Sequence, residues 1–422
     1  MLAQVPVEVP ADPFVLAHAL ADREGVVLAR AHGGRVVYLA CDPTDVSHAL
    51  DPEPARPASP RPFGEIPRWF GLLPYEARRS LERAHATDAR AAPDLATPLW
   101  RRYRGVVKIT HEVHVISADS RVREELRERL RQGVKKPPRA LPPRLALAAP
   151  AEPGPAHATR IRRALESIQA GDIYQVNLAR RFELEVEGTA AQLLEALCRR
   201  GVPPQALAFD WPELRVAMAS PELFLALEPT GRVTTRPIKG TRPRVAEPAA
   251  DRALALALDA DPKERAELAM VIDVERNDLG RLAIPGSVRL AAEPAVESHA
   301  TVHHRAATVE ALLRAGVTRE ELLLAMLPSG SVTGAPKIRA MELIRELEPA
   351  RRGLYTGAAG FLREDGGLEL GMVIRTVTAQ GRRGAYYAGG GIVADSDPER
   401  EVEETLWKAA ALVELVGGEN WA

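Results

Sequence analysis

The amino-acid sequence predicts an α+β fold. Apolar and polar side chains alternate over residues 174–186, and shorter stretches within 206–226 and 368–388 predict further strands close together in the chain. Strands that follow one another at short intervals pair antiparallel, whereas parallel pairs need a long crossover. Helical stretches separate these groups of strands rather than alternating with single strands. We therefore expect α+β architecture and not a doubly wound parallel sheet.

The bulk composition excludes several classes of protein. A chain of 422 residues with 46% hydrophobic residues is long enough for two domains, or for one large domain with a full core. The net charge of −1 gives no electrostatic reason to expect nucleic acid or an anionic membrane as a partner. No apolar run approaches the roughly 18 to 20 residues of a membrane span. The first residues lack a basic segment followed by an apolar run, so no secretory signal is expected.

The two cysteines, Cys41 and Cys198, cannot form a disulfide framework, which fits a reducing, cytoplasmic location. Neither lies in a Gly-rich turn or has an evident histidine partner, so a nucleophilic cysteine is not expected. The chain would then have no glutamine-hydrolysing machinery of its own.

Residues 1–132 are expected to form a first unit. The sequence predicts a strand at 34–41 after a Gly-Gly turn, a Pro-rich loop at 51–62 and a second strand at 103–117. A charged amphipathic helix is predicted at 119–132, with Ser120 as its N-cap and a solvated basic face.

A Pro-rich linker at 133–155 is expected to separate this unit from a second one at 156–413. Predicted helices of the second unit are 159–170, 190–200, one starting at Asp261, 337–346 and 398–416. Its predicted strands are 174–186, two within 206–226 with a turn at Ser220-Pro-Glu222, and 357–362, 368–379 and 383–388.

Lys239 is the first candidate for chemistry, at the centre of residues 235–244 (Thr-Arg-Pro-Ile-Lys-Gly-Thr-Arg-Pro-Arg). Only seven of the 56 basic residues are lysines. Lysine can become a neutral amine and arginine cannot, so a lysine kept between Arg236 and Arg242 is a candidate nucleophile. The two neighbouring positive charges are expected to favour the neutral amine. The local sequence leaves a surface lysine in a turn as the alternative.

Two predicted helices begin alike, with Asp-Pro at 261–262 and at 397–398. The first carries Glu264 and Glu267, and the second carries Glu401 and Glu404. A spacing of three places each pair on one helical face, so the four carboxylates could hold one hard cation. The alternative is structural, because glutamates near helix N-termini favour the helix dipole and Glu264 stands where a capping box would place it.

Two Gly-rich stretches could approach a ligand. Residues 328–337 (Pro-Ser-Gly-Ser-Val-Thr-Gly-Ala-Pro-Lys) lead into a predicted helix whose N–H groups could face an anion, although this is not a Walker loop. Gly389, Gly390 and Gly391 follow an aromatic strand and would let a ligand approach the backbone. Arg375 is a charge within an apolar predicted strand, so we expect it to pair with a carboxylate of the protein or of a substrate.

Taken together, these stretches resemble the chorismate-binding enzymes over about residues 156–413. The matching motifs are Gly171-Asp-Ile-Tyr-Gln-Val-Asn-Leu178, Ser220-Pro-Glu222, Pro237-Ile-Lys-Gly-Thr241, Arg276-Asn-Asp-Leu279, Gly330-Ser-Val-Thr-Gly-Ala-Pro-Lys337, Tyr355-Thr-Gly357, Ile374-Arg-Thr376 and Gly389-Gly-Gly-Ile-Val-Ala-Asp395. The first unit resembles the family more loosely, at Phe70-Gly-Leu-Leu-Pro-Tyr-Glu76. The resemblance implies large antiparallel sheets packed face to face with helices outside, in α/β/β/α layers.

Two positions distinguish the branches of this family. Isochorismate and salicylate synthases have a water-activating lysine where this chain has Gln175, and anthranilate synthases usually have alanine where it has Lys239. The chain therefore resembles the aminodeoxychorismate synthase branch, with anthranilate synthase component I as the alternative. The resemblance implies that Lys239 attacks carbon 2 of chorismate as the 4-hydroxyl leaves. Ammonia from a separate glutamine amidotransferase subunit then attacks carbon 4 and expels the lysine, giving 4-amino-4-deoxychorismate for 4-aminobenzoate and folate synthesis.

The resemblance implies roles for further residues. Glu222 would be the general acid; Mg²⁺ would be held directly by Glu267 and Glu404 and through water by Glu264 and Glu401. The implied substrate contacts are Gln175, Thr241, Ser331, Tyr355, Arg375, Gly389, Gly390 and Gly391. His304 aligns with an active-site histidine, although residues 305–307 (Arg-Ala-Ala) depart from the family's pattern. Lys337 is left outside the catalytic set, as a structural lysine.

Two further expectations concern regulation and alternatives. The first unit lacks the Leu-Leu-Glu-Ser motif of tryptophan-sensitive anthranilate synthases, so no strong feedback by tryptophan is expected. A non-catalytic relative that only senses a ligand is another alternative. The presence of Lys239, Glu222 and all four glutamates argues against it.

Overall fold

The computed structural model describes residues 2–54, 63–80, 90, 94–137, 142–148, 152–299 and 302–416. Strands in these residues form three antiparallel sheets. The first has the order β1 (Ala3–Pro6), β8 (Val113–Ser117), β7 (Gly105–Ile109), β3 (Val36–Ala40), β2 (Val27–Ala31), β11 (Gln205–Asp210), β12 (Arg215–Ser220), β23 (Thr376–Gln380), β24 (Arg383–Ile392), β10 (Gln175–Glu187), β20 (Gly334–Ala335), with β9 (Arg144–Leu147) also on β10.

The second sheet has the order β16 (Arg289–Leu290), β19 (Val309–Leu312), β14 (Arg232–Arg236), β13 (Leu223–Leu227), β22 (Leu368–Met372), β21 (Ala358–Arg363), β5 (Pro67–Leu73), β6 (Leu99–Arg102), β4 (Asp45–Ser47). A small third sheet has the order β15 (Ile238–Pro243), β18 (Val302–Ala306), β17 (Ala295–Ser298). Antiparallel pairing throughout the described strands confirms the α+β prediction.

Helices connect and cover the sheets. They are α1 (Pro13–Ala19), α2 (Ser120–Lys135), α3 (Gly154–Gln169), α4 (Ala190–Leu197), α5 (Pro248–Ala260), α6 (Pro262–Gly280), α7 (Arg319–Met326), α8 (Lys337–Leu347), α9 (Pro398–Lys408) and α10 (Ala410–Leu415), with 3₁₀ turns η1 (His32–Gly34), η2 (Tyr75–Ser80) and η3 (Gly330–Val332). No helix in the described part of the chain is long and apolar enough to cross a membrane.

The two large sheets pack face to face through aromatic side chains. Tyr38 of β3 contacts Phe361 of β21 edge to face, with ring centroids 5.7 Å apart. Phe70 of β5 and Phe209 of β11 also meet edge to face, with ring centroids 6.3 Å apart. Such edge-to-face pairs add about 0.5–1.5 kcal/mol each beyond the area they bury. The inner faces of the two sheets therefore share one core.

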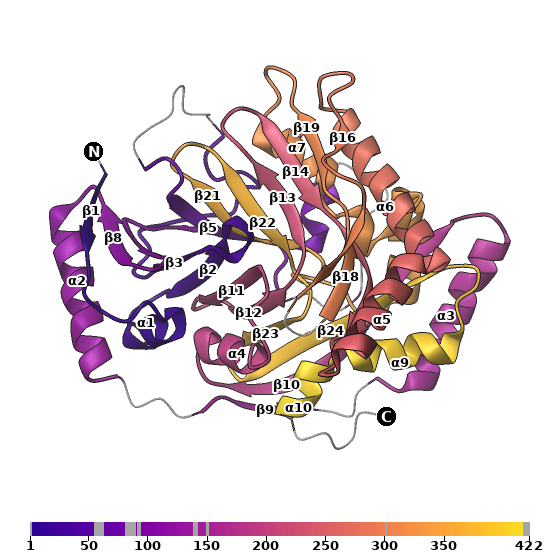
Figure 1. Ribbon diagram of the computed structural model, residues 1–422, viewed down its shortest axis with the longest axis horizontal. Coiled ribbons are helices and arrows are strands. Elements are labelled where there is room, and N and C mark those ends of the chain that lie inside the picture. The colour runs from indigo at the N-terminus through magenta and orange to yellow at the C-terminus, as the bar shows by residue number, and fades with distance from the viewer. Residues whose placement is uncertain are drawn as a thin grey trace.

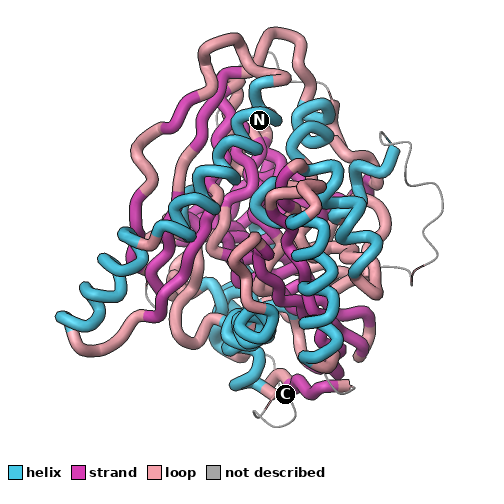
Figure 2. Tube along the Cα trace, turned by 90° about the vertical axis from the view of Figure 1, so that its right-hand side faces the viewer, coloured by secondary structure: helices cyan, strands magenta, loops and turns pink. Residues whose placement is uncertain are grey.

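The outer faces are covered by helices. Side chains of α1, α2, α4 and α10 join the other face of the first sheet, and α6 and α7 pack on the second sheet. Helices α3 and α8 pack against β10 near the end of the first sheet. Figure 1 shows α5, α6 and β18 together on one side of the molecule, and Figure 2 shows the strands inside with helices over them. The α/β/β/α layering is thereby confirmed.

The sheets join the two units that the sequence predicts. β2, from residues 1–132, pairs with β11, and β5 pairs with β21. Described residues of the expected linker at 133–155 also have regular structure, because β9 pairs with β10 and α3 begins at Gly154. β9 itself contains no proline, and the prolines at 142 and 143 precede it, as an edge strand allows. The division into domains stays a prediction.

Several element boundaries differ from expectation. The strand predicted at 103–117 is a hairpin of β7 and β8, which was missed because apolar residues keep the same odd-numbered positions on both sides of its turn. The strand predicted at 368–379 is two strands, β22 and β23. The helix predicted at 398–416 is interrupted at Ala409. Helix α5 was not predicted, and α2 is capped by Asp119, not by Ser120. Asp261 and Asp397 cap α6 and α9 as predicted. Of the Pro-rich loop predicted at 51–62, residues 55–62 lie outside the described residues.

Candidate active site

Two neighbouring crossings between the large sheets form the centre of the candidate site. β12 pairs with β23 in the first sheet, and their continuations β13 and β22 pair in the second. Glu222 lies in the first crossing and Arg375 in the second. The backbone N–H of Met372 donates to the carbonyl oxygen of Glu222 over 3.0 Å, and that of Ala219 donates to the carbonyl oxygen of Arg375 over 3.1 Å. The two crossings are thus hydrogen-bonded side by side.

The prediction that Arg375 lies inside an apolar strand is wrong. The chain leaves one sheet for the other between Met372 and Thr376, and Arg375 lies in this interval with φ of 51°. A left-handed conformation is uncommon for a residue other than glycine and is concentrated at functional sites. Apolar residues continue through the crossing, so the alternation pattern could not reveal it.

Glu222 is a buried carboxyl held by residues 328–337. It is 5% exposed, and the hydroxyl of Ser331 donates to its Oε1 over 2.7 Å. Burial raises the pKa of Glu222 to about 7, against the hydrogen bond from Ser331 and the positive charges of Lys239 and Arg375. The structure thus brings Glu222, Ser331, Lys239 and Arg375 together. A carboxyl with this pKa can act as a general acid near neutral pH.

A second buried carboxyl, Glu275 of α6, lies behind Glu222. It is 0% exposed, and its Oε1 is hydrogen-bonded to the hydroxyl of Ser329 over 2.6 Å. Ser329 Oγ in turn lies 2.9 Å from Ser331 Oγ. Glu275 is therefore linked to Glu222 through two serine hydroxyls. Sequence reasoning missed this residue, because a single glutamate on a helix is not distinctive until its burial is known.

Lys337 has the structural role expected for it. Its ammonium group forms a buried ion pair with Asp278 of α6 and lies 3.5 Å from the carbonyl oxygen of Met326. These contacts tie the start of α8 to α6 and to the end of α7, and so hold the 328–337 stretch in position.

Lys239 lies on β15, opposite Arg305 of β18. The pairing shifts register at Gly240, which has φ of 76°, and a Cβ atom there would lie 2.7 Å from a methyl group of Leu258. Glycine is therefore required next to Lys239. The Lys239 side chain is 11% exposed, and its Nζ lies 3.9 Å from Glu267 Oε2. The alternative of an ordinary exposed lysine is excluded by this burial.

The two arginines that flank Lys239 in sequence do not provide free positive charge beside it. Arg236 forms an ion pair with Glu297, and Arg242 binds Asp261 over 3.0 Å. The expectation that they act directly on Lys239 is therefore not supported. The difference arises because carboxylates that are remote in the chain, Glu297 and Asp261, lie beside the two arginines in the folded protein, and the local sequence does not show them.

The four glutamates meet where α6 and α9 approach each other. Lys263, on α6, lies 3.6 Å from Glu401 and 4.0 Å from Glu267, and so bridges the two helices. Gly390 of β24 lies against the same carboxylates: a Cβ atom there would lie 2.9 Å from Glu401 Oε2 and 3.6 Å from Glu404 Oε1. The two helices therefore approach each other at these carboxylates, and the prediction that the four hold one cation stays a prediction.

The charges of these glutamates act on one another and on nearby lysines. Burial raises the pKa values of Glu267 and Glu401, and neighbouring carboxylates raise them further. Burial acts likewise on Glu404, but Lys408, 2.6 Å away, outweighs it and lowers its pKa. Among the described residues no three acidic, histidine or cysteine side chains lie close enough together to hold a metal ion. Carboxylate oxygens are ligands that Mg²⁺ prefers, but in this structure these carboxylates pair with lysines instead. Sequence reasoning missed two of these lysines, Lys263 and Lys408.

His304 and Thr241 lie side by side on the third sheet. His304 Nδ1 is 2.9 Å from the hydroxyl of Thr241 and 3.3 Å from the carbonyl oxygen of Gly240. Burial lowers the pKa of His304 to about 3, and the positive charge of Arg375 adds to this, so the imidazole is neutral at ordinary pH. Its Nε2 is buried without a hydrogen-bond partner in the described residues. A neutral imidazole with one free nitrogen can accept a hydrogen bond from a ligand or donate one to it.

The glycines of β24 have packing reasons for being glycine. A Cβ atom at Gly389 would lie 2.5 Å from the carbonyl oxygen of Leu178, and one at Gly391 would lie 2.2 Å from Gln175 Nε2. Gln175 is 0% exposed, and neither of its amide atoms has a partner in the described residues. Buried amides without partners are rare and costly, so Gln175 is suited to bind a ligand here.

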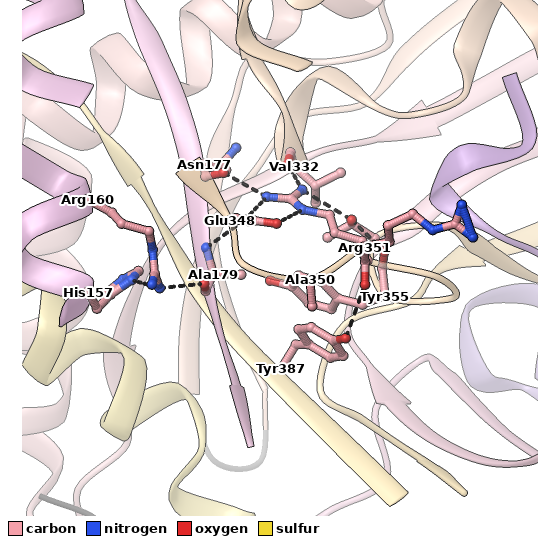
Figure 3. A network of polar contacts seen from close by, with 12 residues as sticks. His157, Arg160, Asn177, Ala179, Val332, Glu348, Ala350, Arg351, Tyr355 and Tyr387 are labelled. Carbon is pink, nitrogen blue, oxygen red and sulfur yellow. Dashed lines mark hydrogen bonds and ion pairs between the residues drawn. The ribbon is translucent and has the colours of Figure 1, made fainter. Parts of the chain in front are cut away.

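Tyr355 is held by a buried arginine that the sequence did not single out. Its ring stacks on that of Tyr387 at 4.7 Å, and the Arg352 guanidinium lies 5.6 Å from its centroid. Arg352 also binds Glu348 through two nitrogens, at 2.7 and 3.0 Å, and donates to the carbonyl oxygens of Asn177 and Val332. Figure 3 shows Glu348, Asn177 and Val332 close to one another, with dashed lines marking polar contacts of the network. Arg352 thus joins β10, η3 and the segment before β21.

A model of one protein family, described as chorismate binding enzyme, matches residues 34–414. Among characterised relatives, aminodeoxychorismate synthase component 1 of Salmonella typhimurium is 39% identical over 373 residues, covering 86% of this chain and 81% of the relative. Anthranilate synthase component 1 of Thermus thermophilus is 45% identical over 262 residues, covering 62% and 56%. Relatives that carry either of the two names are therefore comparably similar to this chain.

Solved structures agree on the fold. Anthranilate synthase component I of Streptococcus pneumoniae superposes with a TM-score of 0.72 at 27% identity, covering 98% of this chain and 92% of the other. The menaquinone-specific isochorismate synthase of Escherichia coli gives 0.75 at 19% identity over 99% and 94%, a likeness that concerns the fold alone.

Proposed function

Because the chain belongs to the chorismate-binding enzyme family and is a chorismate-utilising enzyme of the anthranilate and aminodeoxychorismate synthase type, we propose that it is the synthase component that makes 4-amino-4-deoxychorismate. One observation carries this choice: Lys239, with an 11% exposed side chain, lies in the site where anthranilate synthases of the family usually have alanine. Aminodeoxychorismate synthase component 1 is also the name of the relative that matches over 373 residues.

Lys239 and Glu222 carry out the first step of the proposed reaction. The neutral amine of Lys239 forms a bond to carbon 2 of chorismate, the two conjugated ring double bonds each shift by one position around the ring toward carbon 4, and the bond between carbon 4 and its hydroxyl oxygen breaks. Glu222 donates its proton to that oxygen, so water leaves rather than hydroxide. A buried carboxyl with a pKa of about 7 suits this task, because the protonated form is available near neutrality.

Ammonia completes the substitution. It attacks carbon 4, both double bonds shift back, and the bond from carbon 2 to Lys239 breaks, which restores the free amine. Dividing a difficult displacement into two allylic steps gives each a lower barrier. The ammonia would come from a glutamine amidotransferase subunit, because the cysteines of this chain, Cys41 and Cys198, are buried and burial raises their thiol pKa values.

The remaining residues bind and orient the substrate. Tyr355 and Arg375 would hold the enolpyruvyl carboxylate, and Thr241, Ser331, Gln175 and Gly389 to Gly391 would line the ring. Glu267 and Glu404, with Glu264 and Glu401 through water, would hold Mg²⁺, which when bound neutralises the ring carboxylate of chorismate. Neutral His304, with its free Nε2, would contact the ring side as an active-site hydrogen-bonding group.

The alternative is anthranilate synthase component I, which the relative of 45% identity keeps open. It would use the same carboxylates and substrate contacts but would not need Lys239, and it would release pyruvate. Sequence similarity to known relatives does not distinguish the two activities, so the test must identify the reaction product.

The decisive experiment is product analysis. The purified chain is incubated with chorismate, Mg²⁺ and an ammonium salt, with and without aminodeoxychorismate lyase, beside Lys239→Ala. We expect 4-aminobenzoate only when the lyase is present, and no aminodeoxychorismate from the variant. Anthranilate and pyruvate formed without the lyase would overturn the proposal in favour of the alternative. If the wild type binds chorismate but does not convert it, the result would instead support the alternative of a non-catalytic relative that senses a ligand.

A further inference from the structure

A row of four oxygen atoms connects the two buried carboxyls of the site. Glu222 Oε1 lies 2.7 Å from Ser331 Oγ, Ser331 Oγ lies 2.9 Å from Ser329 Oγ, and Ser329 Oγ lies 2.6 Å from Glu275 Oε1. All four residues are at most 6% exposed. Each separation is that of an O–H···O hydrogen bond, so each of the three contacts needs one proton.

The two serines cannot supply all three protons. Each hydroxyl carries one proton. The nearby backbone N–H groups do not supply the third, because each donates to a single oxygen of the row and not between two of them: the N–H of Ser331 donates to Ser329 Oγ, and the N–H of Gly330 donates to Glu275 Oε1. With both glutamates ionised, one of the three oxygen pairs would face each other through lone pairs alone. At least one of Glu222 and Glu275 must therefore hold a proton for the row to be complete.

We propose that Glu275 is the proton reservoir of the site: a buried carboxylic acid that passes its proton through Ser329 and Ser331 to Glu222 after Glu222 has protonated the departing hydroxyl. This rests on the proposed function for the step that consumes the proton. Glu275 would act on the substrate only through Glu222, so it is a positioning residue for the general acid, and the two serines are the path between them.

The surroundings of Glu275 favour the neutral acid before the reaction. Its Oε2 is buried without a hydrogen-bond partner in the described residues, which is costly for a carboxylate and less so for the carbonyl oxygen of an acid. The nearest cation, Lys337, already forms an ion pair with Asp278. With the proton on Glu275, every hydrogen bond of the row points toward Glu222.

The transfer balances and leaves both end states bonded. The O–H bond of Glu275 breaks as a bond to Ser329 forms, the proton of Ser329 passes to Ser331, and that of Ser331 passes to Glu222 Oε1. The sum is one proton moved and one carboxylate exchanged for the other. Glu275 is then an anion that accepts from the Ser329 hydroxyl and the Gly330 N–H. The proton returns when ammonia, bonded to carbon 4 as an ammonium group, loses one proton to become the amine.

Other charged groups face each end of the row and set its bias. Glu222 faces Lys239 of β15 and Arg375 of the crossing, which both favour its anion. Glu275 faces Lys337 of α8, which favours its anion, and Asp278 of its own helix, which opposes it. Positive charge stands at both ends, so neither position of the shared proton is strongly excluded, as a reversible relay requires.

The first test counts protonated carboxyls without any turnover. Infrared spectra of the wild type and of Glu275→Gln are compared at pH 8, where ordinary carboxyls are ionised. The amide of the variant still donates to Ser329 but has no acid proton. We expect the wild type to show one buried protonated carboxyl that the variant lacks. A difference spectrum without this band would overturn the reservoir, whatever the product of the reaction proves to be.

The second test follows the relay in catalysis. Ser329→Ala interrupts the row, Ser329→Thr keeps its hydroxyl, and Ser117→Ala removes a buried serine hydroxyl that donates to a backbone carbonyl outside the site. We expect at least tenfold lower kcat in Ser329→Ala and Glu275→Gln with the KM for chorismate within about twofold, recovery in Ser329→Thr, and no change in Ser117→Ala. Equal losses in the alanine and threonine variants, or a loss confined to KM, would mean a structural role and overturn the proposal.

Discussion

Lys239 Nζ lies 3.9 Å from Glu267 Oε2, so the candidate nucleophile is paired with a candidate metal ligand. Both side chains are 11% exposed, and at such burial an ion pair is weakly screened. The same carboxylate can serve an ammonium group or a divalent cation. If Glu267 holds Mg²⁺ as proposed, metal binding and the availability of the lysine amine are coupled through this one residue.

The first prediction concerns this coupling. Mg²⁺ bound at Glu267 would compete with Lys239 for the carboxylate and release the amine. We expect modification of Lys239 by an amine-specific reagent to become several-fold faster at saturating Mg²⁺, measured by peptide mass spectrometry. Lys135, at the end of α2, is the internal control and should react at the same rate with and without the metal. An unchanged rate at Lys239 would separate the lysine from the metal site.

The second prediction is a pH dependence of catalysis. Burial raises the pKa of Glu222 to about 7, and only the protonated carboxyl can donate to the leaving hydroxyl. We expect kcat/KM to fall with pH above about 7, by tenfold for each further pH unit, when ammonia is supplied at a fixed free concentration. Glu222→Gln should lose at least 100-fold in kcat. A flat profile between pH 6 and 9 would remove Glu222 from the acid's role.

The third prediction is a pH dependence of stability. The pKa of Glu222 is about 7 in the folded protein and near 4.5 as its ordinary value, so the native state binds the extra proton between these limits. Stability that depends on this carboxyl is therefore present below about pH 4.5 and is lost as pH rises through about 7. We expect Glu222→Gln to gain about 3 kcal/mol relative to the wild type between pH 4.5 and pH 8, by denaturant unfolding. A constant difference between the two proteins would contradict the buried-acid assignment.

The fourth prediction concerns the metal site. Lys263 bridges Glu267 and Glu401, and its ammonium group competes with a cation for both. Its side chain is 45% exposed, so solvent screens the effect and the expected change is modest. We expect Lys263→Met to bind Mg²⁺ two- to fivefold more tightly by calorimetry, and Glu267→Gln to bind it at least tenfold more weakly. Weaker binding by Lys263→Met would mean that this lysine supports the metal site.

Sequence patterns predicted the elements and the chemistry better than the path between the sheets. The Asp-Pro pairs correctly marked the starts of α6 and α9, because N-cap and first-turn preferences are local. A turn at Ser220-Pro-Glu222 was predicted, but not that the chain changes sheets there, and the crossing at Arg375 was missed altogether, since a strand that changes sheets keeps its apolar residues on both sides of the crossing. The sequence pattern therefore predicted one continuous strand at 368–379, whereas the structure has two strands there, β22 and β23.

The candidate site was predicted as a set of reactive residues and not as a set of partners. Lys239, Glu222 and the four glutamates carry chemistry that residue type reveals. Glu275, Arg352 and Lys263 act through tertiary contacts, since the partners of Glu275 at 329 and of Arg352 at 177 are remote in the chain. The charges of Arg236 and Arg242 looked free in sequence because Glu297 and Asp261, which bind them, are distant as well.

The last prediction concerns the buried pair behind Tyr355. Arg352 is 2% exposed and binds Glu348, which is 5% exposed, so removing the guanidinium leaves a buried carboxylate without its partner. We expect Arg352→Met to lose about 3–5 kcal/mol in the free energy of unfolding, measured in denaturant. The matched control is Arg339→Met on α8, where the arginine forms exposed ion pairs with Glu342 and Glu346 and should cost less than about 1 kcal/mol. Equal losses in the two variants would show that burial of the Arg352 pair adds nothing to stability.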